Sequence, residues 1–356
     1  MKTYLHLMNQ SNIQVSKTYM RFCEEKFGNI KHVFCLKEGE KKKEDIGIFE
    51  NVEVEVLRTL SEPLKRYKEY DKIFLHAMCI TLRQQIYILI HPEILDKLYW
   101  IAWGIDLYEY RRKDNVVRTL YTFFQTYFRK KIKYFVGIFP PDINYFTKYI
   151  GRRAKTYYGP YMTQLYSDMK EIEYNDNREI ELVSRRPIKI VVGHSATPVL
   201  RHIDVLKTLE KYSSKDIQIY IPLSYGIKAY GDEVESIANK IFGEKAICIR
   251  EYKPYSEYLS MLKDMDIVIF NTSRQIGLGN IVIYMYLKKK IYMPEKSVMF
   301  QYFRKRGVPV LKYEDLESGS YEDLLQTVDM IPAKKLIEEE YFNKEFLGKC
   351  WGIIFD

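Results

Sequence analysis

Long apolar runs are absent from this sequence. No stretch approaches the roughly 20 apolar residues that a helix needs to cross a bilayer, and the run at residues 86–90 is stopped by His91 and Pro92. Residues 1–10 are too short and too polar for a signal peptide and predict a strand instead. We therefore expect no transmembrane helix.

Cysteine is sparse and never paired along the chain. The five cysteines are scattered singly, with no C-x-x-C pair and no Cys/His cluster. This pattern argues against a structural zinc site and against a disulfide framework, and it is typical of proteins in a reducing compartment.

The composition indicates a globular protein of about two domains. The chain has 356 residues, and a single domain usually holds about 100–200. Hydrophobic residues make up 47% of the chain, which is enough for ordinary cores and argues against global disorder.

The net charge is +9 and aromatic residues make up 15% of the chain. Basic and aromatic residues together can indicate a nucleic-acid surface or an anionic membrane surface. They are concentrated in residues 110–135, which contain eight basic residues, several aromatic residues and a single acidic residue, Asp114. The segment fits a solvated helix with a buried aromatic face, a membrane-facing patch or, as the weakest of the three, a nucleic-acid surface.

Strand and helix patterns alternate along the first half. Strands are predicted at residues 3–8, 32–36, 52–56, 72–76, 99–102 and 133–136, and helices at 15–27, 60–67, 82–90 and 116–127. Residues 137–142, which include Pro140 and Pro141, are predicted to form a loop. Short strands alternating with helices are typical of a parallel α/β architecture.

A polar and charged segment, residues 166–187, divides the chain. Beyond it the alternation restarts, with strands at 188–192, 217–221, 246–250, 267–270 and 291–293 and helices at 202–212, 233–242, 255–263 and 281–287. We predict a first domain at residues 1–165, a linker at 166–187, a second domain at 188–332 and a helical tail at 333–356. Since Trp351 would otherwise lack a core, the tail is expected to cross back to the first domain.

Two segments of the second domain are candidates for binding phosphate. At 190–197 a strand ends in Gly193, and Ser195 follows with a hydroxyl at the strand's carboxyl end, where open α/β sheets bind ligands. At 270–280, Gly277 and Gly279 precede a predicted helix, whose first N–H groups can hold an anion, and Arg274 can add a bidentate contact. Each segment also fits an ordinary glycine turn.

Other candidate residues follow strands. In the first domain, Trp103, Gly104 and Asp106 follow the strand at 99–102, a combination that suits stacking on a sugar and taking a hydroxyl proton. Asp106 also fits a helix cap. His76 ends another strand and is either structural or functional, and residues 220–226 follow a strand of the second domain.

The motifs together resemble glycosyltransferase family 56, the 4-acetamido-4,6-dideoxygalactose transferases of enterobacterial common antigen synthesis. The family's W-G-x-D-L-Y-E segment is matched by Trp103, Gly104, Asp106, Leu107, Tyr108 and Glu109, and its R-Q-x-G-x-G segment by Arg274, Gln275, Gly277 and Gly279. Its V-G-N-S loop is matched at Val192, Gly193 and Ser195, a further stretch at Pro222 and Tyr225, and a histidine at His76. The sequence departs from the pattern at His194, Ala196, Ser224 and Gly226.

The resemblance implies a GT-B fold, two Rossmann-like domains that face each other across a cleft. It also implies a thymidine-diphosphate (TDP) sugar donor, an acceptor linked to undecaprenyl diphosphate, inversion at the anomeric carbon and association with the cytoplasmic face of the inner membrane. From these segments and the resemblance together, the donor is expected at Gly193, Ser195, Pro222, Tyr225, Arg274, Gln275, Gly277, Gly279 and Asn280, and the acceptor at Trp103, Gly104 and Tyr108.

An inverting transfer needs a base for the acceptor hydroxyl. Asp106 is the first candidate, Glu109 the second and His76 the third. We expect no cofactor and no metal ion, because no Asp-x-Asp segment is recognised as a diphosphate–metal site and Arg274 with a helix N-terminus can neutralise the charge. The alternatives are a related transferase with another donor and acceptor, or a non-catalytic basic protein that binds nucleic acid or polysaccharide.

Overall fold

A computed structural model describes residues 1–9, 13–37, 49–109, 115–161 and 187–356 of the chain. Nearly all of the predicted linker, residues 166–187, and part of the basic segment at 110–114 lie outside the described residues. Contacts divide the chain into two compact units, residues 1–164 with 341–356 and residues 165–340.

The first unit is built on a seven-stranded parallel sheet with the order β3-β2-β1-β4-β5-β6-β7. Its strands are β1 (Thr3–Asn9), β2 (Lys31–Lys37), β3 (Val52–Leu57), β4 (Lys72–His76), β5 (Leu98–Ala102), β6 (Tyr134–Gly137) and β7 (Lys155–Tyr158). The order reverses between β1 and β4, as in doubly wound Rossmann-like sheets.

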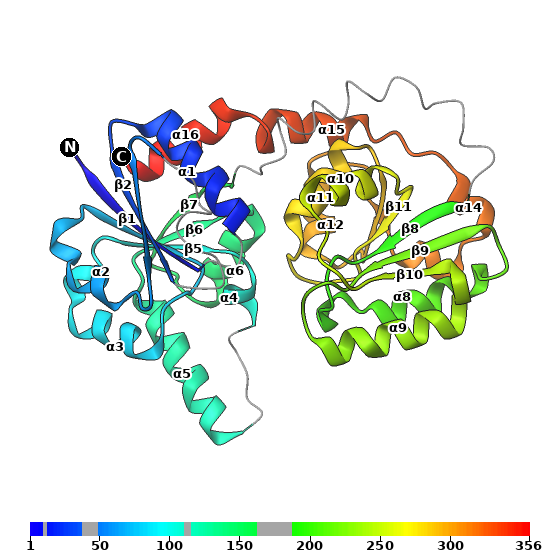
Figure 1. Ribbon diagram of the computed structural model, residues 1–356, viewed down its shortest axis with the longest axis horizontal. Helices are drawn as coiled ribbons and strands as arrows, with labels where there is room; N and C mark the ends of the chain where they lie inside the picture. The colour runs from blue at the N-terminus through cyan, green and yellow to red at the C-terminus, as the bar shows by residue number, and fades with distance from the viewer. Residues whose placement is uncertain (10–12, 38–48, 110–114, 162–186) are drawn as a thin grey trace. The chain divides into compact units, whose positions relative to one another are not determined.

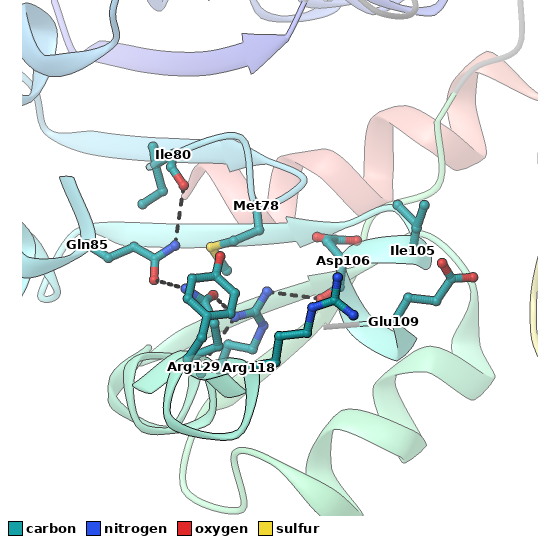
Figure 2. Close-up of a pocket in the computed structure, with 10 residues that line it drawn as sticks. Met78, Ile80, Gln85, Ile105, Asp106, Glu109, Arg118 and Arg129 are labelled. Atoms are coloured by element: carbon teal, nitrogen blue, oxygen red, sulfur yellow. Dashed lines mark hydrogen bonds between the residues drawn. The ribbon is translucent and has the colours of Figure 1, made fainter. Parts of the chain in front are cut away.

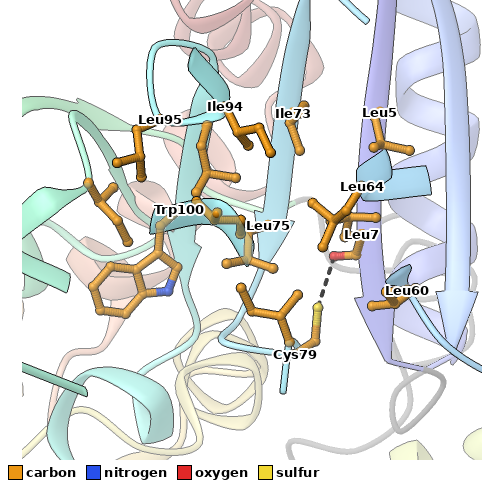
Figure 3. Packing of buried hydrophobic residues seen from close by; sticks show 14 of the residues in the cluster. Leu5, Leu7, Leu60, Leu64, Ile73, Leu75, Cys79, Ile94, Leu95 and Trp100 are labelled. Carbon is orange, nitrogen blue, oxygen red and sulfur yellow. Dashed lines mark hydrogen bonds between the residues drawn. The ribbon is translucent and has the colours of Figure 1, made fainter. Parts of the chain in front are cut away.

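Helices cover both faces of this sheet, because the strands are apolar on both sides. They are α1 (Ile13–Phe27), α2 (Ser61–Lys65), α3 (Leu82–Ile90), α4 (Ile105–Tyr108), α5 (Val116–Lys131) and α6 (Pro140–Tyr149), with 3-10 turns η3 (Tyr67–Glu69) and η4 (Pro92–Ile94). One core joins Leu5, Leu7, Leu75 and Trp100 to α2, α3, α5 and α6 (Figure 3).

The second core of this unit contains the C-terminal helix α16 (Lys344–Phe355). Trp351 is fully buried beside Tyr19 of α1, and its Nε1 donates to the carbonyl oxygen of Pro160 at 2.9 Å. The prediction that the chain's end returns to the first domain is therefore confirmed. Residues 333–340 of the predicted tail belong to the second unit, and residues 341–356 to the first.

The second unit repeats the same order with six parallel strands, β10-β9-β8-β11-β12-β13. They are β8 (Ile188–Val192), β9 (Ile217–Pro222), β10 (Ala246–Ile249), β11 (Ile267–Ile269), β12 (Lys290–Met293) and β13 (Leu311–Lys312). The order reverses between β8 and β11, so this unit is also Rossmann-like.

Helices again cover both faces of the sheet (Figure 1). They are α8 (His202–Leu209), α9 (Lys228–Phe242), α10 (Tyr255–Lys263), α11 (Leu278–Tyr286), α12 (Val298–Lys305), α13 (Glu314–Ser318), α14 (Tyr321–Leu325) and α15 (Ile331–Leu336). Short turns are η5 (Pro198–Leu200), η6 (Glu210–Tyr212), η7 (Gly243–Lys245) and the π turn η8 (Ile337–Tyr341). Helix α11 is buried along most of its length.

Several sequence predictions were wrong. Helix α9 begins at Lys228 instead of residue 233, and α5 continues to Lys131 instead of ending at residue 127. Residues 140–142, predicted as loop, form the first turn of α6, because a proline suits the start of a helix, where its missing N–H has no partner to lose. Helix α11 begins at Leu278 instead of Ile281, so Gly279 and Asn280 belong to its first turn. Strand β7 and the short helices between residues 298 and 325 were not predicted.

Candidate functional site

The two glycine-containing segments of the second unit meet at the point where its strand order reverses. Strands β8 and β11 are neighbours and parallel, so the segments that follow them leave from the same edge of the sheet. The N–H of Gly193 donates to the carbonyl oxygen of Ile269 at 3.0 Å, which joins the two segments at their start. Ligands of doubly wound sheets bind at this kind of switch point.

The loop after β8 is held in a fixed conformation. Gly193 has a φ of 66°, and a Cβ at this position would lie 2.5 Å from Nε2 of His202, so the backbone needs glycine here. Ser195 is buried, and its hydroxyl bonds to that of Thr197 at 2.8 Å. The N–H of Ala196 donates to the carbonyl oxygen of Tyr225 at 2.7 Å. The Pro222–Tyr225 stretch after β9 is thereby attached to the same loop.

The segment after β11 presents the N-terminus of α11. Gly277 is the N-cap residue with a φ of 67°, and no side chain caps the helix. A Cβ on the exposed Gly279 would meet nothing within 4 Å, so the first turn faces open space. Since the first N–H groups of a helix have no partner within it, this terminus can bind an anion.

The other predicted donor residues surround this helix start. Arg274 is 9% exposed, and its Nη1 donates to the carbonyl oxygen of Gln275 at 2.8 Å. Gln275 is itself buried. The side chain of Asn280 accepts a hydrogen bond from the hydroxyl of Tyr258 at 2.9 Å. Tyr258, on α10, was not among the predicted site residues, since its helical segment carries no motif.

In the first unit, Asp106 and Glu109 line one pocket of about 430 Å³ (Figure 2). The pocket lies between α4, α5 and the segment after β4, and its other polar walls are Gln85, Gln125, Arg118 and Arg129. This mixture of carboxylates, amides and guanidinium groups suits a ligand rich in hydroxyls, since both donors and acceptors are available.

Asp106 is held by two hydrogen bonds. Nε1 of Trp100 donates to its Oδ2 at 2.7 Å, and the backbone N–H of Trp103 donates to its Oδ1 at 2.9 Å. Burial raises the pKa of Asp106 above its ordinary value, although these hydrogen bonds and the charge of Arg129 act in the opposite direction. Asp106 lies inside α4, whose N-cap is Gly104, so it is not the helix cap that its position also suggested.

A buried arginine, Arg129, lines the pocket beside Asp106. Arg129 is 2% exposed, its Nη2 donates to the carbonyl oxygen of Asp106 at 3.2 Å, and its guanidinium carbon lies 5.3 Å from the centre of the Trp100 ring. Its Nη1 donates to Gln125, whose amide donates to Gln85 at 2.8 Å. This chain of hydrogen bonds fixes the pocket wall (Figure 2). The sequence motif did not include Arg129 or Gln125, which come from α5.

His76 and the predicted acceptor residues have other partners. His76 is buried and lies in a chain of hydrogen bonds, with 2.9 Å between its Nε2 and Nδ1 of His6 and a further bond from its Nδ1 to the hydroxyl of Tyr161. Burial lowers the pKa of His76 to about 3. Tyr108 donates to Asp142 at 2.6 Å, and the ring of Trp103 meets Tyr161 edge to face. None of Trp103, Gly104 and Tyr108 is among the residues that line the pocket of Asp106.

Helix α5 exposes an apolar surface next to this pocket. Phe128 is buried, but several apolar side chains are exposed, namely Val116, Val117, Leu120, Tyr121, Phe123 and Tyr127. The helix extends away from the sheet of its unit (Figure 1). Since Phe128 is buried but Tyr121, Phe123 and Tyr127 are exposed, the interpretation as a solvated helix with a buried aromatic face holds only in part for the described residues of this segment.

The described residues offer neither a metal cluster nor a membrane-spanning helix. They contain no group of three or more His, Cys, Asp or Glu side chains arranged to hold a metal ion. The one Asp-x-Asp sequence near the site, Asp264 to Asp266, precedes β11 and thus lies at the opposite end of that strand from the donor segments. Within the same described residues, no helix is long and apolar enough to cross a membrane.

Residues 65–348 match the model of the family described as 4-alpha-L-fucosyltransferase, glycosyl transferase group 56. Among solved structures, sucrose-phosphate synthase from Thermosynechococcus elongatus is similar with a TM-score of 0.70 and 11% identity, covering 100% of this chain and 98% of that one. HepE from Anabaena in complex with UDP is similar with a TM-score of 0.67 and 12% identity, and the match covers 100% of this chain and 99% of that one. WaaG, a glycosyltransferase involved in lipopolysaccharide biosynthesis, is similar with a TM-score of 0.61 and 10% identity, and the match covers 98% of this chain and 97% of that one. These similarities establish a GT-B fold for this chain.

Proposed function

The chain belongs to glycosyltransferase family 56, and from this premise we propose that it transfers a TDP-linked, 4-acetamido-4,6-dideoxygalactose-like sugar to a glycan carried on undecaprenyl diphosphate. The transfer inverts the anomeric carbon, needs no metal ion and serves cell-surface polysaccharide synthesis. The observation that supports it most is the meeting of the Gly193 and Arg274 segments at the uncapped N-terminus of α11.

In this proposal the second domain, residues 188–332, binds the donor. Its diphosphate lies against the first turn of α11, where the backbone N–H groups of Leu278, Gly279 and Asn280 have no partner within the helix and no side-chain cap. Arg274 adds a positive charge, and Pro222–Tyr225 lies near the nucleoside. The leaving diphosphate needs charge stabilisation instead of a proton, and a helix terminus with an arginine supplies it.

The first domain, residues 1–165, binds the acceptor and supplies the base. Asp106 remains the first candidate, because it lines a pocket, is positioned by Trp100 and has a raised pKa, and these are properties of a general base. Glu109 lines the same pocket and is the second candidate. His76 is less suited, since both of its ring nitrogens are hydrogen-bonded and its pKa is lowered.

The base is tested by comparing Asp106→Asn with Glu109→Gln. Loss of a general base lowers turnover by about 10²–10⁴, so Asp106→Asn should lose at least about a hundredfold on that principle while TDP-glucose still binds. The asparagine amide would face N–H donors of Trp100 or Trp103, so a loss of about 1–3 kcal/mol of stability is also expected and turnover is measured well below the melting temperature. Normal turnover in folded Asp106→Asn would move the role to Glu109 or His76.

We further propose that the protein is peripheral at the cytoplasmic face of the inner membrane, docked through α5. Exposed apolar side chains such as Leu120 and Phe123 stand beside basic ones, including Lys130 and Lys131. Each basic residue near an anionic surface gives about 1 kcal/mol, so four or five are sufficient for docking. Inserted aromatic side chains add to this.

The reaction itself is tested with purified protein, a TDP-linked 4-acetamido-4,6-dideoxygalactose and a lipid-linked acceptor, with the product's anomeric configuration read by NMR. Retention of configuration would overturn inversion, and loss of activity with a chelator that magnesium restores would overturn metal independence. If another nucleotide sugar alone stabilises the protein in a thermal-shift panel, the chain is a related transferase with a different donor.

The rival from another class is a non-catalytic basic protein that binds nucleic acid or polysaccharide through its +9 charge. For nucleic acid it predicts binding whose logarithm falls steeply with the logarithm of salt concentration, and no donor turnover. Transfer in the purified system would exclude it.

A further inference from the structure

A histidine in the donor loop carries a buried ring nitrogen with which no described residue forms a hydrogen bond. His194 follows Gly193, and its side chain is only 7% exposed. The imidazole is stacked on Phe270, with ring centres 5.6 Å apart and planes at 25°, and it meets the Tyr225 ring edge to face at 6.1 Å. The ring is therefore fixed in place by aromatic contacts.

Nδ1 of this ring is buried and has no hydrogen-bond partner among the described residues. Buried polar atoms in folded proteins are almost always paired with protein or with an ordered molecule, because an unpaired one loses its interaction with water and gains nothing. An orphan nitrogen in a rigid, buried ring therefore indicates a ligand atom that completes the pair.

The orphan nitrogen faces the start of α11. A Cβ placed on Gly277, the N-cap of that helix, would lie 2.9 Å from both Nδ1 and Cε1 of His194. This edge of the ring thus lies against the residue that precedes the unpaired N–H groups of the first turn. Gly279, two residues further on in the same turn, borders open space. The helix terminus and the imidazole are consequently in position to contact the same anion.

The surroundings keep the free imidazole neutral. Burial lowers the pKa of His194 to about 3, and the neighbouring His202 and the positive charge of Arg274 act in the same direction. The Tyr225 ring packs beside it. A bound diphosphate carries two negative charges and would reverse the balance. At a protein-like dielectric one charge about 4 Å away raises a pKa by about three pH units, and a second about 6 Å away raises it by about two more.

We propose that His194 donates a hydrogen bond from Nδ1 to the diphosphate of the sugar nucleotide and takes up a proton as that diphosphate binds. The inference rests on the proposed function, since it concerns the donor site at the N-terminus of α11. The protonated ring then faces the leaving diphosphate during transfer, where a charged donor stabilises the developing negative charge.

The test is isothermal titration calorimetry of the full-length protein with TDP-glucose. In such a diester each phosphate has one ionisable oxygen, already deprotonated at neutral pH, so any proton taken up belongs to the protein. Titrations at pH 7 in two buffers of different ionisation enthalpy give the number of protons taken up. We expect wild-type protein to take up most of one proton, and its Kd to rise at least about threefold between pH 6 and pH 8.

His194→Asn keeps a hydrogen-bond donor but cannot gain a proton, so its binding should be independent of buffer and nearly independent of pH. His194→Gln serves as the second variant if the first melts early. His91→Asn is the matched control, because it removes an imidazole that lies outside this site and should leave proton uptake unchanged.

The outcomes separate the two proposals. TDP-glucose that binds in an Arg274-dependent way but with no proton uptake, or with the same uptake in His194→Asn, overturns the role of His194 and leaves the donor site standing. A complete absence of binding by wild-type protein overturns both. Uptake that disappears in His194→Asn and persists in His91→Asn supports the proposal.

Discussion

Acidification from pH 7 to pH 5 is expected to destabilise this protein strongly, and its first unit most. Five of its six histidines are buried, His6, His32 and His76 in the first unit and His194 and His202 in the second. Burial lowers the pKa of each, to about 4 for His32 and His202, to about 3 for His76 and His194, and well below the ordinary value for His6.

The sign follows from which state holds more protons. In the unfolded chain a histidine has a pKa of about 6.5, so below that pH the unfolded chain binds protons that the folded chain does not bind. Stability therefore falls as the pH falls. The loss begins near pH 6.5 and is complete only near the folded values of about 3 to 4. Between pH 7 and pH 5 each such histidine removes about 2 kcal/mol from the free energy of unfolding.

The three histidines of the first unit together remove up to about 6 kcal/mol, against a total stability of roughly 5–15 kcal/mol for a domain. The sum is an upper bound, because His6 is hydrogen-bonded to both His76 and His32, at 2.9 and 3.0 Å, and their titrations are coupled. A loss of 6 kcal/mol lowers the melting temperature by roughly 12–24 °C for a unit of this size.

Tryptophan fluorescence reports selectively on the unfolding of the first unit, since Trp100, Trp103 and Trp351 all belong to it. Thermal melts at pH 7, 6 and 5 should show the melting temperature of this unit falling as the pH falls. The control variant His91→Asn should show the same fall. A first unit that melts within a few degrees of the same temperature at pH 7 and pH 5 would refute the reasoning, because it would mean that the histidines take up protons as readily in the folded state as in the unfolded state.

The remaining predictions concern the donor site and α5. Gly193→Ala should lower the free energy of unfolding by about 2–5 kcal/mol, because its φ is positive and a Cβ meets His202, whereas Gly279→Ala should melt normally but weaken TDP-glucose binding in calorimetry. Arg274→Ala should weaken the same binding by about 1.5–3 kcal/mol, and unchanged affinity would remove it from the site. The double variant Leu120→Ser, Phe123→Ser should co-sediment less with anionic vesicles than wild-type protein. Equal binding of wild-type protein to neutral and anionic vesicles would contradict an electrostatic dock.

The sequence predicted much of the strand and helix pattern, because apolar runs with clear ends are local signals. Strand β4 and helices α3 and α10 were predicted to the residue. The errors arose where a residue has two structural uses. The proline pair at 140–141 suggests a loop as readily as a helix start, and Gly279 suggested that α11 began later than it does.

The candidate site could be predicted only in part. Motif residues such as Gly193 and Arg274 were found because they are close in sequence to a strand end, and the strand order then brought them together. The hydrogen-bonded chain of His32, His6 and His76 depends on the order β2-β1-β4, which no spacing in the sequence encodes. The same holds for Arg129, which reaches Asp106 from a helix 23 residues further along the chain.

The two units differ in how the helix after the strand at the switch point is capped. Both sheets have the same strand order, so α3 after β4 and α11 after β11 occupy equivalent places. The first turn of α3 is closed by its own side chains, since Thr81 accepts from the N–H of Gln84 and the Gln84 side chain accepts from the N–H of Thr81. The N-cap of α11 is Gly277, which has no side chain to do this. Of these two helices α11 alone leaves its first N–H groups uncapped by a side chain. The proposed anion site therefore falls in the second unit, although the two sheets share one topology.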